Sequence, residues 1–227
     1  EGQFDPLSHL AQFAPEEGEE EIKEEDCVLT FGTANSKLSH FGATSFSLPA
    51  GYTCPFADVC KSVANRKTGK ITDYGEIRCF QTPLEAIRPS VRASRWNNRE
   101  LLHNKTREEM TEIISKSIDY HEFAVRPIQI LRVHDSGDFF SQEYFDAWLE
   151  VIRTRPGIVF YAYTKSLPFW KKRKDEIPTN FRLIASSGGK ADEMIEQEKF
   201  RQAIVVSDME DAIERQLNVD VNEFLAI

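Results

Sequence analysis

Three of the four cysteines of this 227-residue chain lie within one stretch of 26 residues, a spacing that suits a metal centre or redox chemistry. Five residues separate Cys54 from Cys60, and eighteen separate Cys60 from Cys79. Zinc fingers usually begin with two cysteines two to four residues apart, whereas iron–sulfur clusters tolerate irregular spacing. The pattern therefore favours a [4Fe–4S] cluster on these three cysteines, with one iron open to a substrate, a cofactor or another ligand.

Two other interpretations of the cysteines stay open. Zinc would need a fourth ligand, for which His134 and Cys27 are the candidates. Cys27 also begins an apolar run, where a small buried hydrophobe is common. Alternatively, the three clustered cysteines are unconnected and purely structural.

A second polar group is the segment His134-Asp-Ser-Gly-Asp138. A histidine and two carboxylates at Asp135 and Asp138 are able to ligate a metal or move protons near neutral pH, so these three are candidate catalytic residues. Gly137 would allow close approach of the backbone to a ligand. The structural alternative is that one of the aspartates caps the helix that follows.

Lys165 and the segment Ser186-Ser187-Gly188 form a third candidate group. Lys165 closes an apolar, aromatic strand and is a fourth candidate catalytic residue, which would meet a carboxylate or phosphate. The alternative is that it simply ends the strand in solvent. Small residues at Ser186, Ser187 and Gly188 offer backbone N–H groups to an anionic ligand or cofactor. An ordinary turn has the same composition.

Basic residues are concentrated in residues 61–107, which hold eleven Lys or Arg against four Asp or Glu. Arg88, Arg92, Arg95 and Arg99 are spaced by four, three and four residues, so on a helix they form one stripe. Such a stripe predicts a surface for nucleic acid or another anion. The alternative is a solvated face that pairs with the acidic residues 16–26, which hold eight carboxylates and one lysine.

The elements that must position these residues alternate between strands and helices. Short β-branched or aromatic runs predict strands at residues 28–34, 44–50, 128–134, 158–164, 181–187 and 202–208. Helical spacing of apolar residues predicts helices at residues 107–124 and around residues 144–152. This alternation predicts an α/β fold with a parallel sheet, and the polar groups follow its strands, where ligands bind in such folds.

Five or six strand–helix units are too few for a standard eight-stranded TIM barrel, so we expect a partial barrel or an open sheet. The predicted organisation is an acidic leader at residues 1–27 and one barrel-like domain at residues 28–227. The cluster-binding loop would span about residues 51–80.

The remaining composition limits the class of protein. There is no apolar run near the roughly 20 residues of a membrane helix, so we expect no membrane partner. The sequence begins without a basic-then-apolar secretory signal. With few cysteines as well, a reducing cytoplasm is the expected location.

An ordered set of motifs resembles the phage "gene product 88" family over about residues 30–190. The matching motifs are Asn35-Ser-Lys37, Phe46-Ser-Leu-Pro-Ala-Gly51, Cys54-Pro, Cys60, Arg78-Cys-Phe80, Arg132 to Phe140 and Ala162-Tyr-Thr-Lys-Ser166. The resemblance implies a virus-encoded protein in the host cytoplasm and supplies little mechanism.

The chain is more distantly similar to the radical S-adenosylmethionine superfamily. Those enzymes place three cluster cysteines after the first strand of a partial barrel and a glycine-containing polar motif after the second. The resemblance implies a TIM-barrel-like fold and S-adenosylmethionine as a cofactor, although the compact Cys-x3-Cys-x2-Cys pattern is absent here.

The leading hypothesis is thus an iron–sulfur protein, used for redox or radical chemistry on a small or anionic ligand. The alternative is a non-enzymatic module that iron–sulfur or zinc stabilises and that binds nucleic acid or a protein partner.

Overall fold

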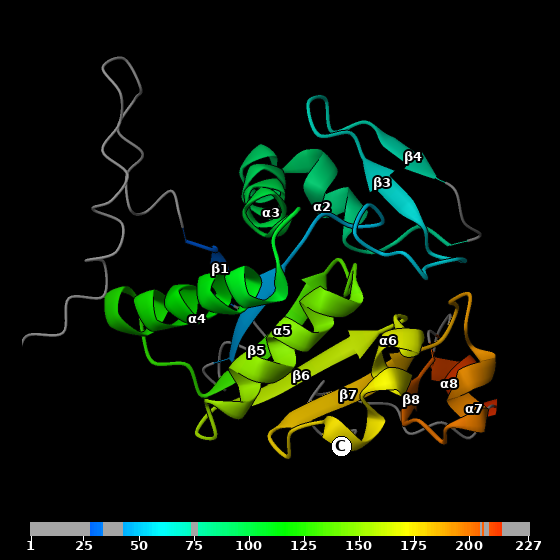
Figure 1. Cartoon of the computed structure of the whole chain (residues 1–227). Helices are drawn as coiled ribbons and strands as arrows, with labels where there is room; N and C mark the ends of the chain where they lie inside the picture. The colour runs from blue at the N-terminus through cyan, green and yellow to red at the C-terminus, as the bar shows by residue number, and fades with distance from the viewer. Residues whose placement is uncertain (1–27, 34–42, 74–76, 205, 207–208, 215–227) are drawn as a thin grey trace, which may run out of the picture.

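A six-stranded sheet lies at the centre of the chain in the order β1-β2-β5-β6-β7-β8 (Figure 1). The computed structural model describes residues 28–33, 43–73, 77–204, 206 and 209–214. The strands of the sheet are β1 (Phe31–Thr33), β2 (Ala43–Ser47), β5 (Ile130–Ser136), β6 (Val159–Thr164), β7 (Phe181–Ser186) and β8 (Gln202–Ala203). From β2 to β8 all neighbours are parallel, and only β1 pairs antiparallel, with β2.

The sheet is open among the described strands. β1 and β8 are its two edges, and no pairing joins them. The predicted parallel α/β architecture is therefore confirmed, whereas closure into a TIM-like barrel is not found. Six strands, of which the two edge strands have three and two residues, give little edge for the closure of a barrel.

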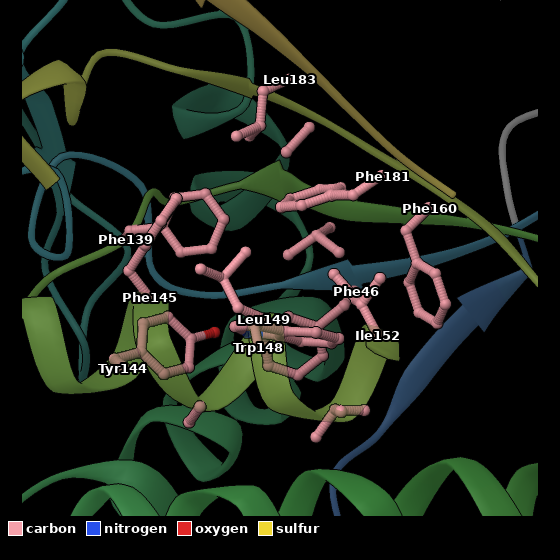
Figure 2. Close-up of a cluster of buried hydrophobic side chains, with 14 of the residues drawn as sticks. Phe46, Phe139, Tyr144, Phe145, Trp148, Leu149, Ile152, Phe160, Phe181 and Leu183 are labelled. Atoms are coloured by element: carbon pink, nitrogen blue, oxygen red, sulfur yellow. The ribbon is translucent and has the colours of Figure 1, made fainter. Parts of the chain in front are cut away.

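Helices pack on the sheet and bury its core. In Figure 1, α4 (Arg107–Ala124), α5 (Gln142–Arg153) and α6 (Leu167–Lys172) lie on the face turned towards the viewer. Figure 2 shows Tyr144 and Trp148 of α5 in one buried cluster with Phe46, Phe160 and Phe181 of the strands. The remaining short helices are η3 (Lys174–Glu176), α7 (Glu193–Gln197) and α8 (Met209–Glu214).

Local sequence explains the two longer helices of this layer. The Ser141 hydroxyl caps α5 by accepting a hydrogen bond from the backbone N–H of Tyr144 at 3.1 Å. In α4, Thr106 and Glu109 form a reciprocal capping box. The apolar residues of α5 recur at helical spacing on the buried face, so burial and capping select the same segment.

A separate unit is inserted between the parallel neighbours β2 and β5. It holds the two-stranded sheet of β3 (Ser62–Ala64) and β4 (Ile71–Asp73), followed by α2 (Thr82–Ile87) and α3 (Pro89–Leu102). Figure 1 shows this unit beyond the end of the sheet towards which β5 and β6 point. The insertion therefore lies at the carboxyl edge of the strands.

The predicted elements agree with the structure in type and differ at their boundaries. The helix predicted at residues 107–124 is α4, and each of the six predicted strand regions overlaps a strand. The acidic leader at residues 1–27 lies outside the described residues. No described helix is both long and apolar enough to span a membrane.

Candidate functional site at the carboxyl edge of the sheet

The loop that carries Cys54 and Cys60 crosses the carboxyl edge of the sheet. It leaves β2 and reaches the loop after β7, where Ala57 forms a bridge with Gly189. The N–H of Lys190 donates to the carbonyl of Phe56 at 2.9 Å, and the N–H of Val59 donates to the carbonyl of Gly188 at 3.3 Å. Backbone pairing thus brings the predicted cysteine loop against a strand end about 130 residues further along the chain.

Gly137 allows this loop to lie directly on the end of β5. Its φ is +82°, and an added Cβ would lie 2.6 Å from Thr53 Oγ1 and 2.7 Å from Leu48 Cβ. The N–H of Leu48 donates to the carbonyl of Ser136 at 2.8 Å beside it. The predicted close approach at Gly137 is therefore to the protein's own cysteine loop.

Asp138 is a buried carboxylate that joins the ends of β5 and β6. It accepts hydrogen bonds from Thr164 Oγ1 at 2.6 Å, from the N–H of Lys165 at 2.8 Å and from the N–H of Phe139 at 2.8 Å. Burial raises the pKa of Asp138 to about 6, against the lowering effect of these bonds. Its position supports a structural role, and its catalytic role stays a prediction.

The raised pKa of Asp138 gives a pH dependence of stability with a definite sign. The unfolded carboxyl loses its proton near pH 4, whereas the folded one keeps it to about pH 6. The folded state therefore holds more protons between these values, and this group's contribution falls by about 2 kcal/mol as pH rises from 4 to 6. Urea unfolding of the wild type and of Asp138→Asn should show this difference, and equal pH slopes would contradict it.

The side chain of Lys165 donates its hydrogen bonds to other residues of the protein. Its Nζ donates to the carbonyl of Ser186 at 3.1 Å and to Ser186 Oγ at 2.9 Å, and it also contacts the carbonyl of Ser187. An ammonium has three donors, and these contacts use all of them. Lys165 thus ties the end of β6 to the loop after β7.

A carboxylate of the protein itself occupies the anion site predicted at Ser186, Ser187 and Gly188. The N–H groups of Gly188 and Gly189 donate to the two carboxylate oxygens of Asp192 at 2.7 and 2.8 Å. The sequence indicates a turn suited to an anion, but it does not show that Asp192, four residues after Gly188, supplies that anion. A cofactor phosphate at these N–H groups would have to displace this carboxylate.

His134 lies in the core rather than at the edge. It is 3% exposed, and its Nε2 lies 3.0 Å from the hydroxyl of Tyr144. Its ring centroid is 4.5 Å from that of Phe139. Burial lowers the pKa of His134 to about 3, so the ring stays neutral near pH 7. A proton-transfer or metal-ligand role therefore finds no support in its position.

Asp135 points into a polar network below the inserted unit. It pairs with Arg132 at 3.0 Å and accepts a hydrogen bond from Gln81 Nε2 at 2.9 Å. Gln81 Oε1 in turn accepts from Arg95 Nη2 at 2.5 Å. Asp135 thus links the end of β5 to the inserted unit, and its catalytic role stays a prediction.

The arginine stripe of α3 is divided by burial. Arg92 Nε donates to the carbonyl of Arg66 at 2.9 Å, and Arg95 forms a 2.7 Å ion pair with Glu85. Both arginines are buried, so they hold the inserted unit together and present no surface to a ligand. Arg88 is exposed, and Arg99 is partly exposed. Arg92, Arg95 and Arg99 lie on α3, whereas Arg88 has an extended backbone between α2 and α3, so the 4-3-4 spacing does not place all four on one helix.

The cysteine cluster is where the structure corrects the functional hypothesis. Among the described residues, no group of three or more His, Cys, Asp or Glu side chains could hold a metal ion. Burial raises the pKa of Cys54 well above its ordinary value and also raises that of Cys60, which favours thiols over the thiolates that metals bind. The predictions of a [4Fe–4S] protein on Cys54, Cys60 and Cys79 and of a metal-stabilised binding module are therefore wrong.

Two features of this edge were not predicted. One is the buried carboxylate of Glu85, which lies in the six-residue helix α2, too short for its sequence to show which face is buried. The other is a cavity of about 190 Å³, the Tyr52 cavity, lined by Tyr52, Thr53, Arg99, His103 and Phe140. The available sequence signal for the cavity was the aromatic residue Tyr52 two positions before Cys54.

Comparison with known proteins gives a family and no mechanism. The chain is 30% identical over 131 residues to the gene 88 protein of Mycobacterium phage L5, and 30% identical over 129 residues to that of Mycobacterium phage D29. Each match covers 54% of this chain and 48% of the relative, so the chain spans about half the length of the curated relatives it matches.

No solved structure matches the chain, and nothing in the comparisons supports a link to radical S-adenosylmethionine enzymes. The family model described as Gene product 88 matches residues 19–226, which is most of the sequence. The chain therefore belongs to the gene product 88 family, as its ordered motifs predicted.

Proposed function

We propose that this protein binds single-stranded nucleic acid through the Tyr52 cavity. The cavity of about 190 Å³ is smaller than the roughly 300–1,000 Å³ of typical small-molecule pockets. Its size suits one base of a longer strand better than a complete small ligand. Thr53 follows β2 and Phe140 follows β5, so the cavity lies at the edge where parallel α/β sheets bind ligands.

The observation that carries the proposal is an exposed aromatic ring covered by a guanidinium. Tyr52 is 52% exposed, and its ring centroid lies 4.7 Å from that of Trp96. The Arg99 guanidinium lies 4.7 Å from the Tyr52 ring and 5.6 Å from the Trp96 ring. Proteins that bind single strands combine aromatic stacking surfaces with positive charge in this way.

Local charge favours this ligand even though the whole chain has a net charge of −9. A second guanidinium, from Arg66, lies 5.1 Å from the Trp96 ring, and His103 at the end of α3 is exposed beside the cavity. Arg92 donates to backbone carbonyls and Arg95 pairs with the buried Glu85 carboxylate, so the stripe contributes to binding mainly through Arg99. Affinity should therefore be highest at low salt.

The other predicted partner, a small anionic ligand at Lys165 and Ser186 to Gly188, has less support. The donors at that site already bind Ser186, Ser187 and Asp192.

The cytoplasm of the host, predicted as the location, is a compartment where single-stranded nucleic acid is available.

Fluorescence anisotropy with a labelled oligothymidylate at low salt tests the proposal. Tyr52→Ala should weaken binding by about 5- to 150-fold, because stacking of one base contributes about 1–3 kcal/mol. Arg99→Gln should lower the slope of log K against log salt by about 0.7, the value for one phosphate contact on a single strand.

Matched variants outside the cavity serve as controls. Tyr120 on α4 is 44% exposed, and Arg182 on β7 is also exposed. Tyr120→Ala and Arg182→Gln should leave affinity and salt slope unchanged. Absence of binding by the wild type at low salt, or equal losses in the control variants, would refute the proposal.

A further inference from the structure

We infer that Cys60 and Cys79 form a dithiol–disulfide pair that exchanges with low-molecular-weight disulfides. This activity goes beyond nucleic-acid binding and uses groups outside the Tyr52 cavity. Cys54, Cys60 and Cys79 are free and partly exposed. The inference rests on how the backbone holds the segments that carry two of them.

Cys60 and Cys79 lie on two segments that are hydrogen-bonded to each other. The N–H of Ile77 donates to the carbonyl of Val59 at 2.7 Å. The N–H of Cys79 donates to Ser62 Oγ at 3.0 Å. These bonds join Cys79 itself and Ile77, two positions before it, to residues one position before and two positions after Cys60. They bring the two segments alongside each other at the open end of the β3–β4 hairpin.

The thiols are also close enough to act on one another electrostatically. Burial raises the pKa of Cys60, the Lys165 ammonium lowers it, and Cys79 raises it. Burial also raises the pKa of Cys54, with further contributions from Asp138 and then Cys79. Cys60 also raises the pKa of Cys54, so all three thiols lie near one another. Cys60 is the one whose thiolate a cation favours, which suits it for the first attack.

The exchange proceeds in two balanced steps. The Cys60 thiolate attacks one sulfur of the small disulfide R–S–S–R, so a Cys60–S–R bond forms, the S–S bond breaks and one R–S⁻ leaves. The Cys79 thiolate then attacks Cys60 Sγ, forming the protein disulfide and releasing the second R–S⁻. Two electrons pass from the chain to the small disulfide, and the protons from the two cysteines pass through water to the two leaving thiolates.

The test uses the full chain with Cys27→Ser, titrated with oxidised glutathione at pH 7, 8 and 9. We expect two glutathione molecules released per chain and a disulfide joining the tryptic peptides of Cys60 and Cys79 in mass spectra. The rate should rise about tenfold per pH unit while the attacking thiol remains mostly protonated. Cys54→Ser should keep the link, and Cys60→Ser should lose it.

Fragmentation of the wild-type linked peptides separates Cys54 from Cys60 even where a variant does not fold. Release of one glutathione with a stable mixed disulfide, or no reaction at any of the three pH values, would overturn the inference. A link from Cys54 instead of Cys60 would overturn it as well. Thermal unfolding of Cys54→Ser and Cys60→Ser verifies that both variants are folded.

Discussion

Replacing Glu85 with alanine should lower the free energy of unfolding by about 3–5 kcal/mol, which is the usual effect of breaking a buried ion pair from one side. The Glu85 Oε1 atom accepts hydrogen bonds from Arg95 Nη1 at 2.7 Å, from the N–H of Ala50 at 2.8 Å and from Ser136 Oγ at 3.3 Å. Its loss leaves the guanidinium of Arg95 buried without its charge partner and frees the start of the cysteine loop.

Urea unfolding followed by circular dichroism measures this effect. The matched control is Glu100→Ala on the same inserted unit, where the carboxylate pairs with Arg66 at the exposed surface. Exposed pairs contribute about 0–1 kcal/mol, so the control should change stability by less than that. Similar losses for both variants would show that burial of Glu85 is not what makes its ion pair important.

Gly137→Ala should lower the free energy of unfolding by about 2–5 kcal/mol. A φ of +82° costs a residue with a Cβ about 1–2 kcal/mol. The new methyl group would also lie 2.6 Å from Thr53 Oγ1 and 2.7 Å from Leu48 Cβ, and overpacking of this kind costs about 1–3 kcal/mol. The cysteine loop would have to move away from the end of β5.

Gly157→Ala is the control for this substitution, since no atom lies within 4 Å of its added Cβ. Gly157 should tolerate alanine or gain about 0.4–1 kcal/mol, because the unfolded chain loses freedom. Thermal and urea unfolding of the two variants provide the comparison. A Gly137→Ala protein as stable as Gly157→Ala would mean that the loop does not approach β5 closely.

The strands of the sheet could be predicted from the sequence because each one is marked by the residues of its own segment. The β5, β6 and β7 strands are short apolar runs that end in polar residues, and the helix between β5 and β6 has its apolar stripe intact. Each pattern reflects which side chains the fold buries, so the apolar residues of a single segment are enough to identify its strand or helix. The meeting of the cysteine loop with the ends of β5, β6 and β7 then followed from strand direction alone.

The chemistry at the edge was less predictable because it depends on which polar groups satisfy one another. The Gly188 turn suits an anion by sequence, and only the structure shows that Asp192 supplies one. Arg92 and Arg99 share a helix and a residue type, yet one is buried and the other covers an aromatic ring. Cysteine spacing likewise indicates proximity, whereas metal ligation requires the thiols to converge on one point.

The insertion between β2 and β5 has a consequence for chain entropy. Ala43 pairs with Ile130, 87 residues later, whereas Ile130 pairs with Val159, only 29 residues later. Loop-closure entropy grows with the logarithm of length, so this threefold longer connection costs only about 1 kcal/mol more. The sheet can therefore accommodate, at nearly constant stability, an inserted unit that varies widely in length. The part of the chain that carries the candidate sites is thus the part whose size the fold constrains least.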